Sequence, residues 1–482
     1  MTPASPASLK DHANYESVRA KYLLLGCQGV GMTALGEILL SAGHQVAGMD
    51  QSLEPPHTTS NPWSDDQVRL LPWSGAALKS GPFDICVTSP AVSRDTPIVK
   101  QLLREGVAVM SLHECLAFVF AENDQLCVAG SHGKSTTSAM LAWILESAGL
   151  APGFFVGAKQ AGFECSGRTA GNGTVVLESC EYQSSFCHFS PRLAVITGLE
   201  RDHFDCYPNT SAEDSAFRQF VARIPTDGCL VYRKECQRTA GIAHATACRT
   251  TTFSLKDSTA EWFAADIRCH GWRTHFRLLR PAAQSIDVDL SAVGEHNVAN
   301  ALAAMAAAAE YGVDANSAVE ALSRFPGIQR RFELCGHYQD MTLIDDYAHH
   351  PTAVRATLTT ARKVFAQSRI LAVFEPHQII RTRALFQDFV QALTLADEVL
   401  LLPVFPAREQ VTHLECCRLS GELVRQLNNN AVKSFLFANL DQVVSRIDHS
   451  GRPDDVILTM GAGRTNLIHD QLTRRLRRHS VA

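Results

Sequence analysis

A glycine-rich segment at residues 128–136, VAGSHGKST, has the composition and order of a phosphate-binding loop. Backbone N–H groups in such a loop can surround a phosphate at the start of a helix, where the helix dipole favours anions. Lys134 would then reach the β- and γ-phosphates of a nucleoside triphosphate, and the Ser135 hydroxyl would bind Mg²⁺. Val128 stands where the full motif has glycine, so a simple turn beside a solvated lysine is the alternative. The residues predicted to bind ATP phosphate are Gly130, Ser131, His132, Gly133, Lys134, Ser135 and Thr136.

Two polar residues follow predicted strands downstream of this loop. Glu178 lies near the end of the apolar run 175–179, and His203 follows the next apolar run. Open α/β sheets bind ligands at the carboxyl ends of their strands, so we expect both side chains near the phosphates. Because Mg²⁺ prefers oxygen ligands, Ser135 and Glu178 would hold one ion. His203 would hold a second, less usual one through a ring nitrogen. A surface or capping role is the alternative for His203. The predicted catalytic residues are Lys134, Glu178 and His203.

A second glycine-rich loop, GCQGVGM at residues 26–32, precedes a predicted helix, and Asp50 closes the strand after it. This order is typical of a nucleotide-binding site of the Rossmann type. The glycines are spaced G-x-x-G-x-G rather than G-x-G-x-x-G, so the diphosphate of another nucleotide fits as well as a redox dinucleotide. A nicotinamide-dependent oxidoreductase and a tight turn without a ligand are the alternatives.

Apolar runs alternating with helical patterns predict three β-α-β cycles, which begin near residues 21, 125 and 342. The segment 51–75 is predicted to be a loop because it is rich in Pro, Ser and Trp. The predicted helices are 32–43, the helix within 125–149, the alanine-rich segment 294–313, one after Pro351 and one from about 382. The other predicted strands are 21–26, 44–50, 84–92, 107–111, 175–179, 193–205, 342–346, 369–376, 398–404 and 455–463.

Length and composition exclude several classes of protein. The chain has 482 residues, which fits about three domains at about 150 residues each. A net charge of −5 is unlike that of a general nucleic-acid binder. No apolar run reaches the roughly 18 residues of a membrane span, and residues 1–20 lack the apolar core of a secretory signal peptide. We therefore expect a cytoplasmic protein. The fifteen cysteines form no C-x-x-C pair, and we expect most of them to be free, buried thiols.

The ordered series of motifs resembles the Mur ligases, the ATP-dependent peptide-bond-forming family of bacterial cell-wall precursor synthesis. The resemblance covers about residues 20–475, and the joint order of the motifs makes it specific. DDYAHHP, QRRFE, FEPHQIIRTR and the N-terminal glycine loop are most similar to the members that add L-alanine to UDP-N-acetylmuramate. The shared motifs are GCQGVGM, AGSHGKSTT, the strand of Glu178, ERDHFD, GEHNVANALAA, QRRFE, DDYAHHP, FEPHQIIRTR and LTMGAG.

The resemblance implies an α/β fold of three domains and a ligase that uses ATP and Mg²⁺. Residues 1–20 are rich in Pro, Ser and Ala, which predicts a disordered tail. The domains implied by the resemblance are a Rossmann-like UDP-sugar-binding domain at 21–119, a central P-loop ATPase-type domain at 120–325 and a Rossmann-like C-terminal domain at 326–482. L-Alanine would join the lactyl carboxylate of UDP-N-acetylmuramate through an acyl phosphate. The protein would be a monomer or homodimer.

The resemblance also implies roles for particular residues. Asn297 and Asn300 would recognise adenine from one helix face, while Arg331 and Asp346 would contact ATP from the C-terminal domain. The UDP-sugar would lie on Gly29, Gly31, Asp50 and Ser89. The amino acid and product would lie on His349, His377, Arg381 and Arg383, because an arginine fork suits a carboxylate.

Several positions depart from the pattern of the alanine-adding members. Gln28 replaces a glycine, Gln378 replaces an arginine, and Arg464 replaces an acidic residue. Cys180 and Gln183 replace acidic residues in the segment ESCEYQSSF. Three alternatives therefore stay open: a recycling ligase that attaches an intact tripeptide, a ligase for glycine or L-serine, and a non-catalytic UDP-sugar-binding protein.

The ATP contacts expected from two domains imply closure by a hinge motion. We expect the hinge at Phe325 to Gln329, where Pro326 and Gly327 interrupt the helical pattern.

Overall fold

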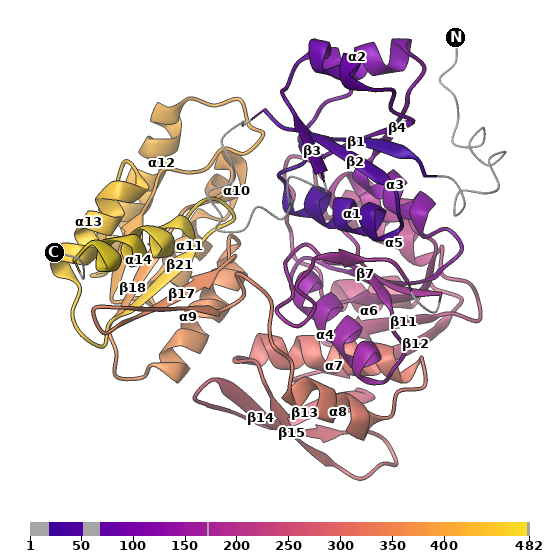
Figure 1. Ribbon diagram of the computed structural model, residues 1–482. Helices are drawn as coiled ribbons and strands as arrows, with labels where there is room; N and C mark the ends of the chain where they lie inside the picture. Colours follow the sequence, from indigo (N-terminus) through magenta and orange to yellow (C-terminus); the bar gives the residue numbers. More distant parts are fainter. Residues whose placement is uncertain (1–18, 52–67, 171–172, 480–482) are drawn as a thin grey trace.

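The computed structural model describes residues 19–51, 68–170 and 173–479. Three β-sheets, each flanked by helices, follow one another along the chain (Figure 1). The first two lie stacked on one side of the molecule, and the third lies beside them. The α/β fold with three sheets confirms the predicted fold class. The predicted disordered tail at 1–20 falls almost wholly on residues 1–18, which lie outside the described residues.

The first sheet has the strand order β3-β2-β1-β4-β5, and every pair in it is parallel. Its inner strands are continuous apolar runs because helices cover both faces of a parallel sheet. The segment 51–75 was predicted to be a loop, and this is wrong for Val68–Leu71, which forms β3. Backbone hydrogen bonds to β2 stabilise this short edge strand although its own sequence has little strand character. The elements are β1 (Lys21–Leu25), α1 (Val30–Ser41), β2 (Gln45–Met49), β3 (Val68–Leu71), η3 (Gly75–Ser80), β4 (Ile85–Thr88), α2 (Pro97–Arg104), β5 (Ala108–Ser111) and α3 (Leu112–Val119).

The second sheet is the largest, with the strand order β15-β14-β13-β12-β11-β10-β6-β9-β7-β8. Its centre is parallel. At one edge β14 pairs antiparallel with both β13 and β15, and at the other edge β8 pairs antiparallel with β7. The elements are β6 (Asp124–Ala129), α4 (Lys134–Ser147), β7 (Gly153–Phe155), β8 (Gly167–Arg168), β9 (Thr174–Glu178), η4 (Tyr182–His188), β10 (Pro191–Ile196), α5 (Thr210–Val221), β11 (Cys229–Arg233), α6 (Gln237–Ala243), β12 (Arg249–Ser254), β13 (Trp262–His270), β14 (Arg273–Leu279), β15 (Ile286–Leu290), α7 (Glu295–Ala309) and α8 (Ala315–Ser323).

The third sheet has the strand order β16-β17-β21-β18-β19-β20, in which only β16 is antiparallel. A helix was predicted from about 382, but α10 begins at Ile379 and the helix breaks at Leu385 before α11. The elements are β16 (Glu333–Tyr338), β17 (Met341–Asp346), α9 (Pro351–Val364), β18 (Ile370–Phe374), α10 (Ile379–Ala384), α11 (Phe386–Leu393), β19 (Glu398–Leu401), α12 (His413–Asn429), β20 (Lys433–Leu436), α13 (Leu440–Ser450), β21 (Val456–Met460) and α14 (Leu467–His479).

The first two sheets share a hydrophobic core. Helices α1 and α3 pack their apolar faces against residues of both sheets, so Leu35 and Leu116 lie in one cluster with Cys127 and Phe217. The Glu37 carboxylate of α1 also accepts hydrogen bonds from the backbone of Ser166 and Gly167. The third sheet has its own cores. Domain movement is therefore expected of the third sheet against the other two.

The chain turns toward the third sheet at a different place from the hinge predicted at residues 325–329. Ile328 forms a β-bridge with Gln160, and the N–H of Gln329 donates to the Lys159 carbonyl at 3.0 Å. The segment 325–329 is thus fastened to the second sheet. Arg330 and Phe332, at φ 60° and 51°, have left-handed backbone conformations where the chain turns toward the third sheet. We therefore place the change of direction at residues 330–332.

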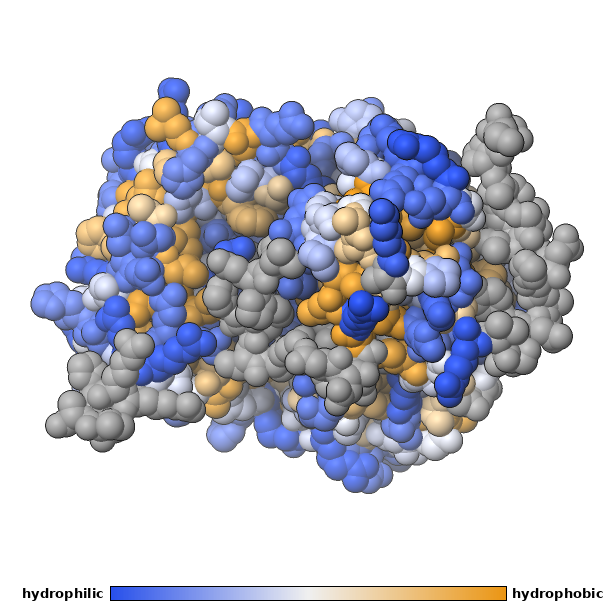
Figure 2. Space-filling view, turned by 45° about the horizontal axis from the view of Figure 1, so that its top comes forward, coloured by the Kyte–Doolittle hydropathy of each residue, from blue (hydrophilic) through white to orange (hydrophobic). Residues whose placement is uncertain are grey.

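The helices, the surface and the cysteines test the remaining expectations from composition. No helix among the described residues is long and apolar enough to cross a bilayer. Polar side chains cover much of the face shown in Figure 2, with smaller apolar areas between them. All fifteen cysteines are free, as predicted, but only seven of them are buried, so the expectation that most are buried is wrong.

Candidate active site

The loop between β6 and α4 has the backbone that a phosphate loop requires. Gly130 and Gly133 have φ values of +128° and +78°. A Cβ at Gly130 would lie 2.3 Å from the Thr197 hydroxyl, and one at Gly133 would lie 2.3 Å from the Asn300 side-chain oxygen. Both positions therefore exclude larger residues, although Val128 departs from the motif. Helix α4 begins directly at Lys134, so its N-terminus faces the loop.

Lys134 lies at the centre of a buried charge cluster. Its ammonium donates to the Gly130 carbonyl at 2.6 Å and forms an ion pair with Glu181 at 2.9 Å. Glu181 is completely buried and also contacts the His203 ring, with 3.3 Å between Oε1 and Nε2. Burial alone would lower the pKa of Lys134, but the negative charges around it, Glu181 first, outweigh burial and raise it. The lysine is therefore a fixed positive charge at the loop.

Ser135 and Glu178 form the oxygen pair predicted for a metal ion. The Ser135 hydroxyl donates to Glu178 Oε1 at 2.8 Å. Adjacent ligands of an octahedral ion with bonds of about 2.0–2.1 Å lie about 2.9 Å apart, so this separation fits Mg²⁺. The other Glu178 oxygen accepts from the Gly157 N–H at 2.5 Å, which fixes the carboxylate. His203 lies across the cluster, in a left-handed conformation at φ 51°.

The Glu181 carboxyl predicts a specific acid sensitivity. Burial would raise its pKa, but Lys134 and His203 outweigh burial and lower it from 4.5 to about 2. The unfolded chain therefore takes up this proton at higher pH than the folded chain, so the stabilisation is complete above about pH 4.5 and is lost toward about pH 2. We expect the stability difference between the natural chain and Glu181→Gln to shrink as pH falls through this window. Urea unfolding at several pH values measures it, and a difference independent of pH would contradict the assignment.

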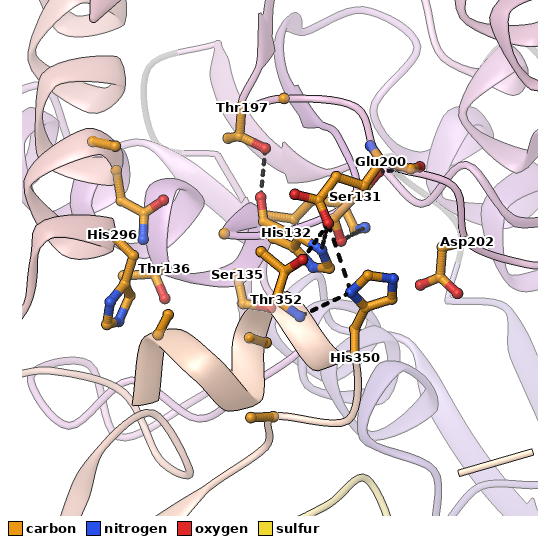
Figure 3. A pocket seen from close by; sticks show the side chains of 18 of the residues that line it. Ser131, His132, Ser135, Thr136, Thr197, Glu200, Asp202, His296, His350 and Thr352 are labelled. Carbon is orange, nitrogen blue, oxygen red and sulfur yellow. Dashed lines mark hydrogen bonds and ion pairs between the residues drawn. The ribbon is translucent and has the colours of Figure 1, made fainter. Parts of the chain in front are cut away.

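A cavity of about 580 Å³ extends from the loop to α7 and α9 (Figure 3). Its lining includes six of the seven residues predicted to bind phosphate, from Ser131 to Thr136, and Gly130 lies directly beside them. Asn297 and Asn300 also line the cavity. The Asn300 amide donates to the Asn297 side-chain oxygen at 3.1 Å, and the Asn297 amide donates to the Val293 carbonyl at 2.8 Å. The pair therefore forms a fixed polar wall.

The third domain closes the cavity from the opposite side. Arg331 donates to the Ser135 hydroxyl at 3.2 Å, although the two residues lie 196 positions apart. Asp346 also lines the cavity, and its oxygens accept from the backbone N–H groups of Phe332 and Ala348, at 2.8 Å each. Burial raises the pKa of Asp346. Both residues predicted to contact ATP from the C-terminal domain, Arg331 and Asp346, therefore line the same cavity as the phosphate loop.

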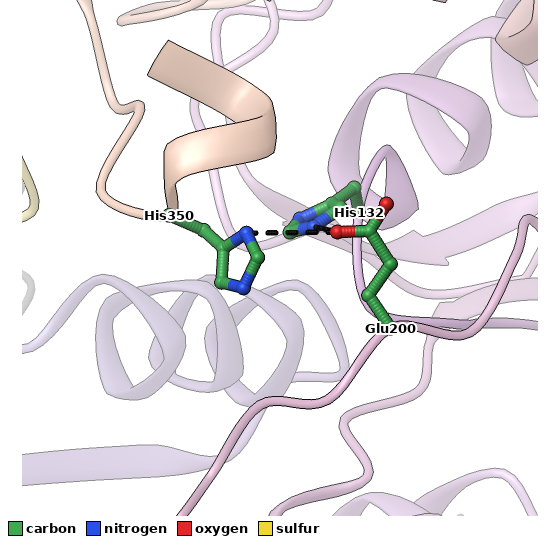
Figure 4. Close-up of side chains that lie close together, drawn as sticks. All are labelled: His132, Glu200 and His350. Atoms are coloured by element: carbon green, nitrogen blue, oxygen red, sulfur yellow. Dashed lines mark hydrogen bonds and ion pairs between the residues drawn. The ribbon is translucent and has the colours of Figure 1, made fainter. Parts of the chain in front are cut away.

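Glu200 joins the two halves of the site. Its Oε2 lies 3.2 Å from His132 Nε2 and 3.7 Å from His350 Nδ1, and it accepts from the Thr352 hydroxyl at 2.6 Å (Figure 4). His132 belongs to the phosphate loop, while His350 caps α9 in the third domain. Three ligand atoms, one each from His132, Glu200 and His350, lie within 4.8 Å of one another, so these three side chains could also hold a metal ion.

The residues predicted to bind the amino acid are only partly brought together. His349 lines the cavity, and its ring lies 5.7 Å from that of His377. Arg381 is buried, and its Nε and Nη2 donate to Asp202 Oδ1 at 2.8 and 2.7 Å, while Nη1 lies 3.0 Å from His377 Nδ1. Arg383 is exposed and does not line the cavity. The geometry groups three of the four residues.

The residues predicted for the UDP-sugar gather at the carboxyl edge of the first sheet. Gly29 and Gly31 lie at the start of α1, Asp50 follows β2, and Ser89 follows β4. This edge includes the switch point between β1 and β4, where doubly wound sheets bind nucleotides. Gln28, which replaces a glycine, donates its N–H to Asp50 Oδ2 at 3.0 Å. The substitution therefore leaves the backbone contact to Asp50 in place.

The other departures are accommodated locally. Cys180 lines the cavity, and burial raises the pKa of its thiol to about 12. Gln183 has φ 53°, and its N–H donates to Cys206 Sγ at 3.1 Å. The Arg464 N–H donates to Glu375 at 3.1 Å. None of these contacts involves the Ser135 and Glu178 pair.

Sequence reasoning assigned no role to four residues that shape this site. Glu181, Glu200, Asp202 and His350 hold Lys134, His132, Arg381 and Thr352 in place. The available signals were proximity to assigned residues: Glu181 three positions after Glu178, Asp202 beside His203, and His350 beside His349. None of these spacings identifies the partner across the fold.

Family models match three successive parts of the chain. Residues 21–123 match the Mur ligase family catalytic domain, 128–308 match the Mur ligase middle domain, and 330–463 match the Mur ligase glutamate ligase domain. Together they cover all three sheets.

Individual proteins match over nearly the full length. The chain is 36% identical over 456 residues to the UDP-N-acetylmuramate-L-alanine ligase of Kineococcus radiotolerans, covering 91% of this chain and 93% of that protein. The crystal structure of the UDP-N-acetylmuramate-alanine ligase of Thermotoga maritima matches with TM-score 0.80 and 24% identity, covering 96% and 100% of the two chains. The murein peptide ligase of Psychrobacter arcticus matches with TM-score 0.73 and 28% identity, covering 94% and 98%.

Proposed function

This chain belongs to the Mur ligase family, and we propose that within the family it joins L-alanine to UDP-N-acetylmuramate. Relatives named for that reaction, at 31% and 36% identity over more than nine tenths of the chain, support this choice. Enzymes of this family depend on ATP. The reaction would be the first amino-acid addition in the synthesis of the peptidoglycan precursor.

One observation carries the proposal for the chemistry. The phosphate loop, the Ser135 and Glu178 oxygen pair, and Arg331 from the third domain converge on one cavity. Phosphoryl transfer requires mainly positioning and neutralisation of charge, which such a site supplies. We propose that Asn297 and Asn300 border the adenine and that Asp346 lies beside the ATP.

The proposed reaction has two steps. A lactyl carboxylate oxygen of UDP-N-acetylmuramate attacks the γ-phosphorus of ATP, which gives an acyl phosphate and ADP. The amine of L-alanine then attacks the acyl carbon, loses a proton, and expels phosphate from the tetrahedral intermediate to leave the amide. Negative charge grows in both steps, and the Lys134 ammonium and the loop N–H groups are positioned to stabilise it.

The residues present fit a requirement for Mg²⁺. Ser135 and Glu178 would hold one ion, and His203 would contribute to a second. A bound ion would neutralise phosphate charge and polarise the transferred group. Glu181 orients both Lys134 and His203, so it couples the loop to this second position.

The three domains divide the work in this proposal. The first sheet, about residues 21–119, would bind the UDP-sugar at Gly29, Gly31, Asp50 and Ser89. The central domain, about 120–325, would bind ATP, and the C-terminal domain from 326 would close over it. We propose that His349, His377 and Arg381 border the amino-acid site. A reaction that consumes ATP and a nucleotide-linked sugar is expected in the cytoplasm.

A second candidate function is attachment of an intact tripeptide to the same UDP-sugar. The 28% identity to the murein peptide ligase of Psychrobacter arcticus favours it. In the family resemblance, the tripeptide ligases lack the histidine and paired arginines of FEPHQIIRTR, and this chain keeps them as His377, Arg381 and Arg383. We therefore place the tripeptide activity second.

Phosphate release tests the proposal. ATP, Mg²⁺ and UDP-N-acetylmuramate would be combined with L-alanine, glycine, L-serine or the tripeptide L-Ala-γ-D-Glu-meso-diaminopimelate. Release that depends on L-alanine is the expected result. Release with the tripeptide alone would move the chain to recycling, and no release with any acceptor would favour a non-catalytic UDP-sugar-binding protein.

A further inference from the structure

The residues proposed to border the amino-acid site, His349, His377 and Arg381, offer no unengaged positive charge to a carboxylate. An incoming amino acid carries a carboxylate next to its amine, and a desolvated carboxylate requires a charged or multiple hydrogen-bonding partner. Burial, with help from the positive charge of Arg381, lowers the pKa of His377 to about 4 and that of His349 well below its ordinary value. Both rings are therefore neutral at neutral pH.

Arg381 is charged, but its donors are already engaged. Nε and Nη2 donate to Asp202, at 2.8 and 2.7 Å, and both partners are at most 5% exposed. The remaining nitrogen, Nη1, faces His377. A substrate carboxylate could take two donors of this guanidinium only by displacing Asp202 or His377. Asp202 is also held in place because it accepts from the His203 backbone N–H at 2.7 Å. At Gln378, where the resemblance leads us to expect an arginine, the chain has no charge.

Arg408 supplies a guanidinium beside the same segment. It lies in the loop between β19 and α12, and this loop is fastened to the segment that carries His377. Phe405 exchanges backbone hydrogen bonds with Pro376 and Gln378, at 2.8 Å each. Phe405 also stacks on the His377 ring, with centroids 5.7 Å apart. Arg408 is therefore held close to position 378 by backbone pairing.

The Glu409 carboxylate adds a second fastening to this loop. It accepts hydrogen bonds from the N–H groups of Ile379 and Ile380, at 2.5 and 2.9 Å. The residue next to Arg408 thus caps the helix that carries Arg381.

The Arg408 side chain faces the central domain. Its Cζ lies 4.0 Å from the centroid of the Tyr182 ring, and the Tyr182 ring lies 5.4 Å from that of His203. A single aromatic ring thus separates this guanidinium from the charge cluster around Glu181. Arg408 Nη2 forms an ion pair with Asp205 Oδ2 at 3.8 Å, a separation longer than a hydrogen bond. Within the described part of the chain, Arg408 donates no hydrogen bond, so its donors are open to a ligand.

We propose that Arg408 binds the α-carboxylate of the incoming amino acid and takes the place of the arginine missing at position 378. The inference rests on the proposed function and specifies how its acceptor is recognised. Tyr182 and the loop of Phe405 hold the guanidinium at the interface between the domains, and the amine of the amino acid would point past Tyr182 toward the reacting carboxyl group.

This contact would distinguish a free amino acid from a peptide. In a free amino acid the α-carbon that bears the amine also bears a carboxylate with full negative charge. In a peptide the first residue has an uncharged amide at that position. A charge-assisted contact of about 1.5–3 kcal/mol corresponds to about 10- to 100-fold in affinity. Arg408 would therefore favour L-alanine over any acceptor whose first carboxyl group is an amide, including the tripeptide.

The test compares L-alanine with L-alaninamide as acceptors for Arg408→Gln. Phosphate release is measured with ATP and UDP-N-acetylmuramate saturating. We expect KM for L-alanine to rise about 10- to 100-fold and the preference for L-alanine over L-alaninamide to fall by a similar factor. Arg418→Gln is the matched control, because Arg418 lies on α12 with its side chain 80% exposed and, among the residues that the structure describes, forms an ion pair only with Glu422. It should match the natural chain.

A double variant that moves the positive charge from position 408 to position 378 gives the most decisive test. Adding Gln378→Arg to Arg408→Gln should restore much of the preference for L-alanine, since it returns a guanidinium to the neighbouring backbone position. An unchanged KM and preference in Arg408→Gln would overturn the inference. An equal loss with both acceptors, with the preference intact, would also overturn it by showing that Arg408 only supports the loop.

The proposed function fails separately from this inference. If the natural chain releases no phosphate with L-alanine, the function itself is wrong and the inference falls with it. If the natural chain uses L-alanine and Arg408→Gln keeps its preference, only the inference is wrong.

Discussion

Lys134→Met is expected to slow phosphate release by about 10³-fold or more, the largest effect of any single substitution in the site. Lys134 is the only lysine or arginine of the phosphate loop. Its ammonium is held in place by a hydrogen bond to the Gly130 carbonyl and an ion pair with Glu181. No neighbouring side chain of the loop can replace a charge at that point. Phosphate release with all three substrates measures the effect.

A loss of activity could also come from misfolding, because Lys134→Met leaves the Glu181 carboxylate buried with one partner fewer. Adding Glu181→Gln removes that charge, so the double variant should regain stability but not turnover. Lys100→Met is the matched control, since Lys100 lies on α2 and forms an exposed ion pair with Asp95, which precedes the helix. Turnover by Lys134→Met within about tenfold of the natural rate would contradict the role of this lysine.

Arg381→Met is expected to have the largest effect on stability, about 3–5 kcal/mol, because it leaves Asp202 buried without its ion partner. The pair joins the third domain to the loop of His203, so docking of the third domain should weaken as well. Chemical denaturation gives the free energy, and small-angle scattering reports the separation of the domains.

A double-mutant cycle isolates the contact itself. Asp202→Asn combined with Arg381→Met should cost less than the sum of the two single changes, since the second substitution removes a charge that the first has left unpaired. Arg383→Met, two positions along and exposed, should change stability by no more than about 0.5 kcal/mol. Additive single and double variants would show that the two side chains do not interact.

The parts of the fold that could be predicted are those with strong local signals. Strands such as β1 and β18 are unbroken apolar runs because helices bury both of their faces. The phosphate loop is recognisable because its glycines are required by backbone conformation and by close contacts at Gly130 and Gly133. Strand β3 was missed because it has only four residues, its two buried residues Val68 and Leu71 show no alternation with the exposed ones, and it follows a segment rich in turn residues.

The parts of the site that could not be predicted depend on long-range contacts. Asp202 and Arg381 lie 179 positions apart, and nothing local to either indicates a buried ion pair. Glu181 was visible as an acid near Glu178, but its partners Lys134 and His203 come from other strand ends. The hinge was placed at 325–329 from Pro326 and Gly327, whereas the bridge between Ile328 and Gln160 becomes visible only in the fold.

The central claim is that this chain activates the lactyl carboxylate of UDP-N-acetylmuramate as an acyl phosphate before L-alanine attacks. Labelling that carboxylate with ¹⁸O tests it most directly, because the oxygen that attacks the γ-phosphorus leaves with the phosphate. Mass spectrometry of the products from ATP and L-alanine should show one ¹⁸O in each phosphate released and one in the amide of the product. Phosphate without ¹⁸O, formed alongside the alanine adduct, would contradict the account.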